Sequence, residues 1–393
     1  MDARDTEILL RVLGDWFFSR GEGVFASLPE DGKKELCAAA RPLCLAGFFA
    51  WYVKDALPVE CRAEFVRGFH ASAARELGRE ASLKKTQAVL EEAGIDYIPL
   101  KGSFLAYEVY PHPALRPRVD VDLLLREADL KHAAEVFHQL GWRNYDERNH
   151  SLHIPGLVAP DNRTMCELHF GIFHGAGSAG NAELWNAAIP CGGRRFLLPP
   201  ELTLLQLIDG AVDDNLQFGL KPLADSAMLI AKFNLTAAGL REAAEKYSPS
   251  LSDVLDLLFA AFPEFYPEFF TAGVSSGRFP AEVVSAFRAL PLLAGVQHHD
   301  SYGIVLEREF QHRSFAERCR FLLSNLFAHP ANVRKRYNLP PGRRWNLPFY
   351  YLLDLLRKAG IFFKFRRGGS SKELASAAGA QAVLIRYLNR GRH

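Results

Sequence analysis

Residues 114–125 read ALRPRVDVDLLL, and the two aspartates in this stretch decide how the fold is interpreted. Side chains along an extended strand alternate between its two faces, so Asp120 and Asp122 lie together on one face. The opposite face, which we expect to point into a core, holds Val119, Val121, Leu123 and Leu125. Two adjacent carboxylates repel each other unless a cation lies between them, and Mg²⁺ prefers such oxygen ligands. The stretch therefore predicts a strand that carries a metal site.

A second strand is expected to supply a third acid. In TMCELHF, residues 164–170, the side chains of Met165, Glu167 and His169 alternate onto one face. Glu167 completes the metal site if this strand lies beside the first. We interpret His169 as a packing residue, with a hydrogen bond to Glu167 or to substrate as the alternative.

The segment before the paired acids has the features of a phosphate-binding turn. In IPLKGSF, residues 98–104, a strand ends and a helix begins, with Ser103 as the expected cap. Gly102 allows a ligand to approach, and N–H groups in the first helical turn face it. Lys101 adds a point charge, and Arg116 adds a guanidinium group that matches phosphate oxygens. Together these residues predict a site for phosphate beside the metal.

The composition is that of a folded globular chain. The chain has 393 residues, of which 49% are hydrophobic and 12% aromatic. The N-terminus has acids where a signal peptide needs basic residues, and no apolar run approaches the ~20 residues that span a bilayer. We therefore expect a cytoplasmic protein. Its six cysteines form no CxxC pair, which argues against a zinc site.

The C-terminal segment is strongly basic. Residues 313–393 contain 17 Lys and Arg against three acids, whereas the whole chain has a net charge of only +2. Within this segment, residues 343–367 interleave aromatic and basic side chains, and a helix of this kind can lie on an anionic membrane. We favour the alternative that its apolar residues pack into a helical domain.

Changes in periodicity divide the chain into three regions and predict an α+β fold. Residues 1–82 have helical periodicity and form the N-terminal region. Residues 83–198 alternate between helices and short strands and form the core with a small mixed sheet. Residues 199–393 are helical again and include the basic tail.

The order of these motifs is similar to that of a known family. Residues 88–142 contain a lysine-glycine turn, a tyrosine-proline segment, an arginine and a D-x-D strand in sequence. They resemble the uncharacterised bacterial nucleotidyltransferase family of the DNA polymerase beta type superfamily. CELHF, residues 166–170, is similar to the glutamate-x-histidine strand of that family, and residues 197–210 and 221–230 are similar to its helical segments.

The resemblance implies a role for each site residue. Asp120 and Asp122 would be metal ligands and Glu167 the third carboxylate. The segment Lys101, Gly102 and Ser103 would be the phosphate turn.

The function predicted from these features is a metal-dependent nucleotidyl transfer. A nucleoside monophosphate would pass from a nucleoside triphosphate such as ATP to a hydroxyl or phosphate of a small molecule, sugar or peptide, with Mg²⁺ or alternatively Mn²⁺ as cofactor. The other hypothesis is a non-catalytic nucleotide-binding or regulatory protein that retains the same fold. Nucleic acid is not expected as a substrate, and the sequence does not identify the acceptor.

Overall fold

The structure is a computed structural model, and it divides into two compact units, Met1–Leu292 and Leu293–His393. It describes residues 3–18, 23–41, 43, 45–145, 152–162, 164–173, 178–213, 220–263, 265–266 and 278–293, with isolated positions between 350 and 387. The fold given below is that of the first unit. The basic segment 343–367, for which we predicted packing against a helical domain, lies outside the described residues apart from Tyr350.

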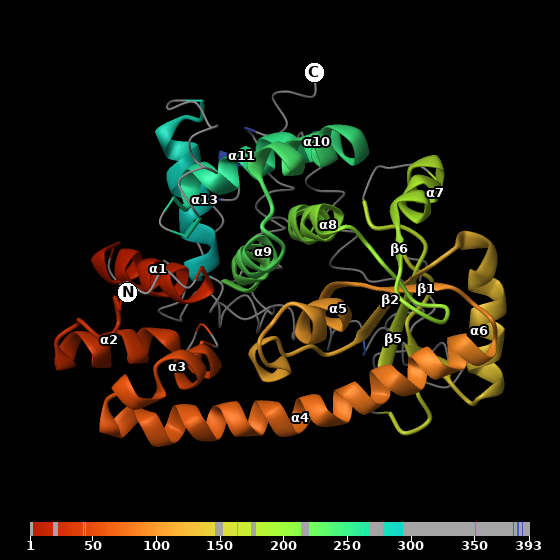
Figure 1. Ribbon diagram of the computed structural model, residues 1–393, viewed down its shortest axis with the longest axis horizontal. Helices are drawn as coiled ribbons and strands as arrows, with labels where there is room; N and C mark the ends of the chain where they lie inside the picture. The colour runs from red at the N-terminus through yellow and green to blue at the C-terminus, as the bar shows by residue number, and fades with distance from the viewer. Residues whose placement is uncertain are drawn as a thin grey trace. The chain divides into compact units, whose positions relative to one another are not determined.

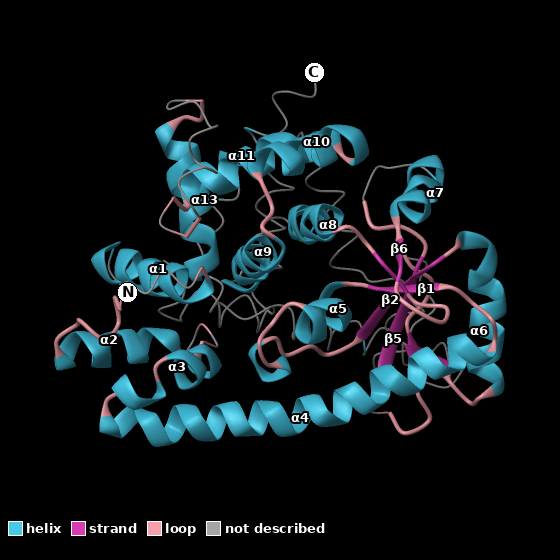
Figure 2. Ribbon diagram, in the orientation of Figure 1, coloured by secondary structure: helices cyan, strands magenta, loops and turns pink. Residues whose placement is uncertain are grey.

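Helices make up most of the first unit (Figures 1 and 2). Before the sheet come α1 (Ala3–Phe17), α2 (Glu30–Ala40), α3 (Ala46–Tyr52) and α4 (Val59–Glu92). Between the strands lie α5 (Lys101–Glu108), α6 (Leu130–Gln139) and α7 (Ser178–Ala187). After the sheet come α8 (Pro200–Asp213), α9 (Leu220–Phe233), α10 (Ala237–Tyr247), α11 (Ser252–Ala261) and α13 (Ala281–Leu293). Short 3₁₀ turns are at Lys54–Ala56, Pro113–Leu115, Glu127–Asp129 and Pro249–Leu251.

A small mixed sheet lies among these helices and confirms the α+β prediction. Its five strands are β1 (Tyr97–Pro99), β2 (Val121–Leu125), β5 (Met165–His169), β4 (Leu157–Val158) and β3 (Arg143–Asn144), in that spatial order. The pairing of β2 with β5 is parallel, and the other pairings in this sheet are antiparallel. A separate antiparallel pair is formed by β6 (Ile189–Pro190) and β7 (Phe196–Leu197).

The long helix α4 joins the N-terminal helices to the sheet. It contacts α3 at one end and α6 at the other, as Figure 1 shows along the lower edge of the molecule. The boundary that we predicted between residues 82 and 83 falls inside this helix, because no proline interrupts residues 59–92. The division into three regions stays a prediction. The helix ends before Gly94, whose φ of 69° is the left-handed conformation that closes many helices.

The core of the sheet is formed by alternate residues of β2, as predicted, with one exception. Val121, Leu123 and Leu125 are buried in a cluster with residues of α4, α6 and β5. Val119 was predicted to join them but is 72% exposed, because residues 119 and 120 form a bend before the strand begins. The strict alternation therefore starts at Val121, and Asp120 precedes the strand.

No helix in the described residues is long and apolar enough to cross a membrane. Membrane contact through the basic tail stays an untested alternative.

Candidate functional site

The site is built by the parallel pairing of β2 with β5. In this register Asp122 is opposite Glu167 and Leu124 is opposite His169. The sequence required these two strands to be neighbours if Glu167 was to join the acids, and the structure confirms that they are. On β5, Cys166 and Leu168 point to the core, which leaves Glu167 and His169 on the face that Asp122 shares.

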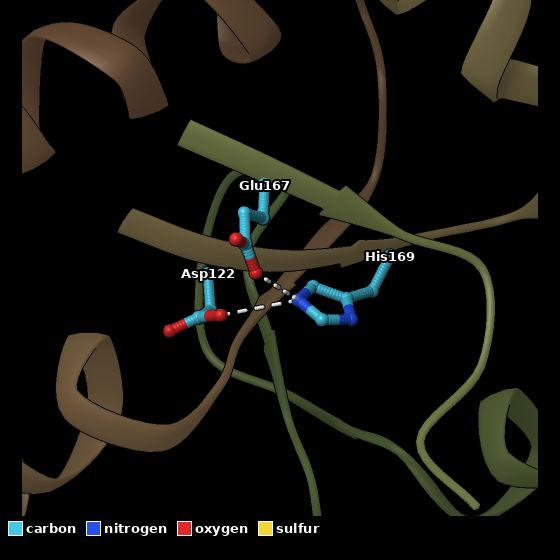
Figure 3. Close-up of side chains that lie close together, drawn as sticks. All are labelled: Asp122, Glu167 and His169. Carbon is cyan, nitrogen blue, oxygen red and sulfur yellow. Dashed lines mark hydrogen bonds and ion pairs between the residues drawn. The ribbon is translucent and has the colours of Figure 1, made fainter. Parts of the chain in front are cut away.

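Three side chains meet at this point, from two adjacent strands (Figure 3). The Nε2 atom of His169 lies 3.1 Å from Asp122 Oδ1 and 3.5 Å from Glu167 Oε2. One ligand atom from each of the three residues lies within 4.8 Å of the others, so they could hold one metal ion. The side chains of Asp122 and His169 are only 3% and 4% exposed, whereas that of Glu167 is 22% exposed. The site therefore runs from the interior toward solvent.

Asp120 lies beside this group and is not one of its three members. Burial raises the pKa of the Asp120 carboxyl to about 6, and the negative charges of Asp122 and Glu167 add to the effect. The bend at residues 119 and 120 explains its separation from the strand. Asp120 remains our prediction for a metal ligand, and a cation would offset the part of the pKa shift that comes from its acidic neighbours.

This raised pKa predicts a pH-dependent gain in stability for Asp120→Asn. The native state holds the Asp120 proton up to about pH 6, but the unfolded chain loses it near pH 4. The charge of Asp120 therefore destabilises the metal-free protein increasingly between pH 4 and 6, and fully above that range. We expect the variant to gain about 1 kcal/mol in unfolding free energy at pH 7.5, allowing for partial exposure, and almost nothing at pH 4. Urea unfolding in the presence of a chelator measures this.

Asp122→Asn is the matched control and should change stability in the opposite direction. Burial alone would raise the pKa of Asp122, but the charge of Lys101 and the hydrogen bond from His169 hold it below its usual range. Removing that carboxylate removes favourable contacts. A gain of stability in both variants would contradict the distinction between the two acids.

Lys101 neutralises part of the acidic cluster. Its Nζ donates to Asp122 Oδ1 at 3.0 Å, and its side chain is 40% exposed, so it connects the buried carboxylate to solvent. Burial would lower the pKa of this lysine, but the charge of Asp122 and the hydrogen bond to it raise the pKa above the usual value. Lys101 also has a φ of 44°, which is uncommon for a residue other than glycine. The turn thus places a positive charge beside the acids, and contact of Lys101 with phosphate stays a prediction.

Glu167 is held between two histidines. The hydrogen bond from His169 lowers the pKa of Glu167, against the effects of burial and of the charge on Asp122. His153 Nε2 lies 3.8 Å from Glu167 Oε2, and the His153 and His169 rings are 5.0 Å apart. Glu167 is therefore ionised at neutral pH and available to a cation.

A family model described as an uncharacterised nucleotidyltransferase matches residues 39–258, more than half of the chain. The chain belongs to this nucleotidyltransferase family. The match runs from the end of α2 into α11 and includes β1, β2 and β5, so it covers all of the site residues named above. Searches of curated proteins and of solved structures gave no match.

The family description supports transferase activity with a nucleoside triphosphate as substrate. The donor set fits the divalent metal that nucleotidyltransferases usually use, because Asp122, Glu167 and His169 are close enough to share one ion.

Two residues of the expected phosphate turn have structural contacts in this nucleotidyltransferase. A Cβ atom added to Gly102 would lie 2.9 Å from Arg118 Cβ, so glycine allows the close approach of Arg118. Ser103 does not cap α5 as we predicted, since the helix begins two residues earlier with no side-chain cap. Instead its hydroxyl accepts from the backbone N–H of Asp122 at 3.1 Å. The turn is thereby joined directly to the strand that carries the acids.

Arg116, which we predicted as a phosphate contact, is buried. Its Nε donates to Asp225 Oδ1 of α9 at 2.5 Å, and the Tyr110 hydroxyl donates to the same oxygen at 2.7 Å. Arg116 is therefore held by the helical region. Its guanidinium group is nevertheless close to the turn, since a Cβ atom added to Gly102 would lie 3.5 Å from Arg116 Nη1. Its contact with phosphate stays a prediction.

Two residues have a larger role than the sequence analysis gave them. We favoured packing over a hydrogen bond for His169, yet its ring bridges two acids. Its position two residues after Glu167 on the same strand face was the available signal. Asp225 is a single acid in the apolar stretch PLADSAMLI, and an acid on the buried face of a helix indicates a buried partner. That partner, Arg116, is 109 residues away, which no local pattern reveals.

Proposed function

We propose that the protein transfers a nucleoside monophosphate from a nucleoside triphosphate to a hydroxyl or phosphate group of a small molecule, sugar or peptide. The arrangement would be that of the DNA polymerase beta type superfamily, with a divalent cation held by Asp122 and Glu167 and by Asp120. The observation that carries this proposal is the parallel register of β2 and β5, which places Asp122 opposite Glu167 beside the Lys101 turn.

The bond changes define what the residues must do. An oxygen of the acceptor forms a bond to the α-phosphorus, and an acceptor hydroxyl gives its proton to solvent. The bond from that phosphorus to the bridging oxygen breaks, and pyrophosphate leaves with the bonding electron pair. Asp122 and Glu167 would hold a divalent cation, which when bound would supply stabilisation of the negative charge that develops during the transfer. Asp122 and Glu167 supply carboxylates that are ionised at neutral pH, and the partly exposed Lys101 ammonium binds phosphate oxygens. These residues orient the triphosphate relative to the acceptor.

Pyrophosphate release tests the proposal directly. The full chain is incubated with each of the four ribonucleoside triphosphates, with Mg²⁺ or Mn²⁺, and with a panel of sugar, small-molecule and peptide acceptors. We expect release that requires metal and that a chelator abolishes. Binding of a triphosphate without release from any mixture would favour the alternative, a nucleotide-binding protein without turnover.

Lys101→Ala should separate recognition of phosphate from recognition of the nucleoside. The ammonium is directed toward the acids and solvent and offers a charge-assisted bond to phosphate, so its loss should weaken triphosphate binding about tenfold or more. Binding of the corresponding nucleoside should change less than about twofold, since it carries no phosphate. Calorimetric titration with both ligands in the presence of Mg²⁺ measures the two effects.

Lys84→Ala is the control for a general loss of positive charge. Lys84 pairs with Glu80 one turn away on the exposed face of α4, and its removal should change neither affinity. Equal weakening of triphosphate and nucleoside binding in Lys101→Ala would exclude the phosphate role of the turn.

A further inference from the structure

The imidazole of His169 occupies the position of a metal ligand. Its Nε2 lies 3.1 Å from Asp122 Oδ1 and 3.5 Å from Glu167 Oε2 (Figure 3). Donor atoms that share one divalent ion at about 2.1 Å lie roughly 3.0 to 3.5 Å apart. Both separations that involve the histidine nitrogen have this spacing, and all three donor atoms lie within 4.8 Å of one another, so an ion could bind there with little rearrangement of the strands.

The backbone fixes this spacing. Asp122 and Glu167 are opposite each other in the β2–β5 register, and His169 is two residues further along β5 on the same face. His169 is also buried, so its ring has little freedom to turn away from the two carboxylates. A ligand set on paired strands is more rigid than one on loops.

The other nitrogen of the ring does not fix which tautomer His169 adopts. Within the described residues, His169 Nδ1 is buried and has no hydrogen-bond partner. An acceptor at Nδ1 would hold the proton there, and a donor would hold it on Nε2. Without such a partner, Nε2 can donate a hydrogen bond to Asp122 in the metal-free protein, or offer its lone pair to an ion.

We propose that His169 is a nitrogen ligand of the cation held by Asp122 and Glu167, and that the site therefore selects a first-row transition ion over Mg²⁺. The inference deepens the proposed function, on which it rests for the use of a cation. Mg²⁺ takes oxygen ligands, whereas an imidazole nitrogen favours ions further along the series from Mn²⁺ to Zn²⁺. Two carboxylates and one imidazole form a mixed donor set that suits such ions.

The test is pulsed electron paramagnetic resonance of Mn²⁺ bound to the metal-free full chain. A directly bound imidazole nitrogen couples to the Mn²⁺ electron spin and modulates the echo. We expect this nitrogen modulation in the natural protein, and a changed pattern when the histidines carry ¹⁵N. Absence of nitrogen coupling in a sample that binds Mn²⁺ would overturn the proposal, and this measurement needs no variant.

Two variants assign the signal to one histidine. His169→Gln should abolish the nitrogen modulation, whereas His153→Gln should retain it. His153 is the matched control because its ring is only 5.0 Å from that of His169, but its Nε2 is 3.8 Å from Glu167 and its Nδ1 contacts Ile154 O at 2.7 Å. Loss of the modulation in His153→Gln with retention in His169→Gln would show that His153 is the nitrogen ligand, and would overturn the proposal.

Metal selectivity gives a second readout that does not depend on activity. We expect the natural protein to bind Mn²⁺ at least about 30-fold more tightly than Mg²⁺, and His169→Gln to reduce this ratio by about tenfold. An equal loss of affinity for both ions in His169→Gln would indicate that His169 only orients the acids.

Asp122→Asn separates this inference from the proposed function. If Mn²⁺ binds without nitrogen coupling and Asp122→Asn removes the binding, the carboxylate site stands and His169 is not a ligand. If neither ion binds to the natural protein, with or without triphosphate, the proposed function itself fails.

Discussion

Replacing Asp122 with asparagine should reduce the rate of metal-dependent pyrophosphate release by about 1,000-fold or more. Asp122 is the acid that the structure places at the centre of the site, because its Oδ1 is within 3.1 Å of both Lys101 Nζ and His169 Nε2. Asparagine keeps the size of the side chain but loses the charge that attracts a cation. A bound cation contributes several kcal/mol of transition-state stabilisation, and each 1.4 kcal/mol corresponds to a factor of ten in rate.

The measurement compares initial rates at saturating triphosphate and metal, with circular dichroism to show that the variant is folded. Asp96→Asn is the control. Asp96 directly precedes β1 of the same sheet, and its Oδ1 lies 3.3 Å from Arg194 Nη1, so it pairs with a residue outside the site. Its rate should remain within about twofold of that of the natural protein. If Asp122→Asn unfolds more easily yet keeps its activity, the acids form a structural ion-pair site and not a metal site.

The strands of the site could be predicted because each carries a local signal. The apolar residues Val121, Leu123 and Leu125 alternate with Asp122, and this alternation alone places the carboxylate on the face away from the core. Glu167 was found in the same way on a second strand. The exception, Val119, shows the limit of the pattern. A bend at residues 119 and 120 precedes the strand, and the prolines and arginines before the bend do not show at which residue the alternation begins.

The contacts between distant segments could not be predicted from local patterns. Ser103 has the residue type of a helix cap, but its hydroxyl accepts from Asp122 N, which lies 19 residues further along the chain. A hydroxyl accepts equally well from either donor, so only the packing of α5 on β2 decides between them. The same holds for Arg116, whose charge matches phosphate and carboxylate alike.

Replacing Asp225 with alanine should destabilise the protein by about 3 to 5 kcal/mol, the second large effect that the structure predicts. The side chains of Arg116 and Asp225 are 6% and 1% exposed, so the substitution would leave a guanidinium group buried without its partner. The Tyr110 hydroxyl would lose its acceptor as well. Urea unfolding at pH 7.5 in the absence of metal measures the change.

Comparison with an exposed ion pair tests whether burial causes the loss of stability in Asp225→Ala. Arg41 donates to Glu64 through Nε and Nη2, at 2.8 Å for the shortest contact, but the two side chains are 40% and 50% exposed. Glu64→Ala should therefore leave the unfolding free energy nearly unchanged, because water replaces the lost contact.

Asp225→Ala, together with a double variant, also distinguishes a structural role of Arg116 from a phosphate contact. If Arg116 serves to join the sheet region to α9, replacing both members of the pair, as in Arg116→Met with Asp225→Leu, should recover much of the stability lost in Asp225→Ala, because no buried charge remains unpaired. Triphosphate binding should then be nearly normal in the double variant. If the double variant is stable but binds triphosphate about tenfold more weakly, while Asp225→Ala alone costs little stability, Arg116 contacts phosphate as its guanidinium chemistry predicted. The burial of both side chains favours the structural role.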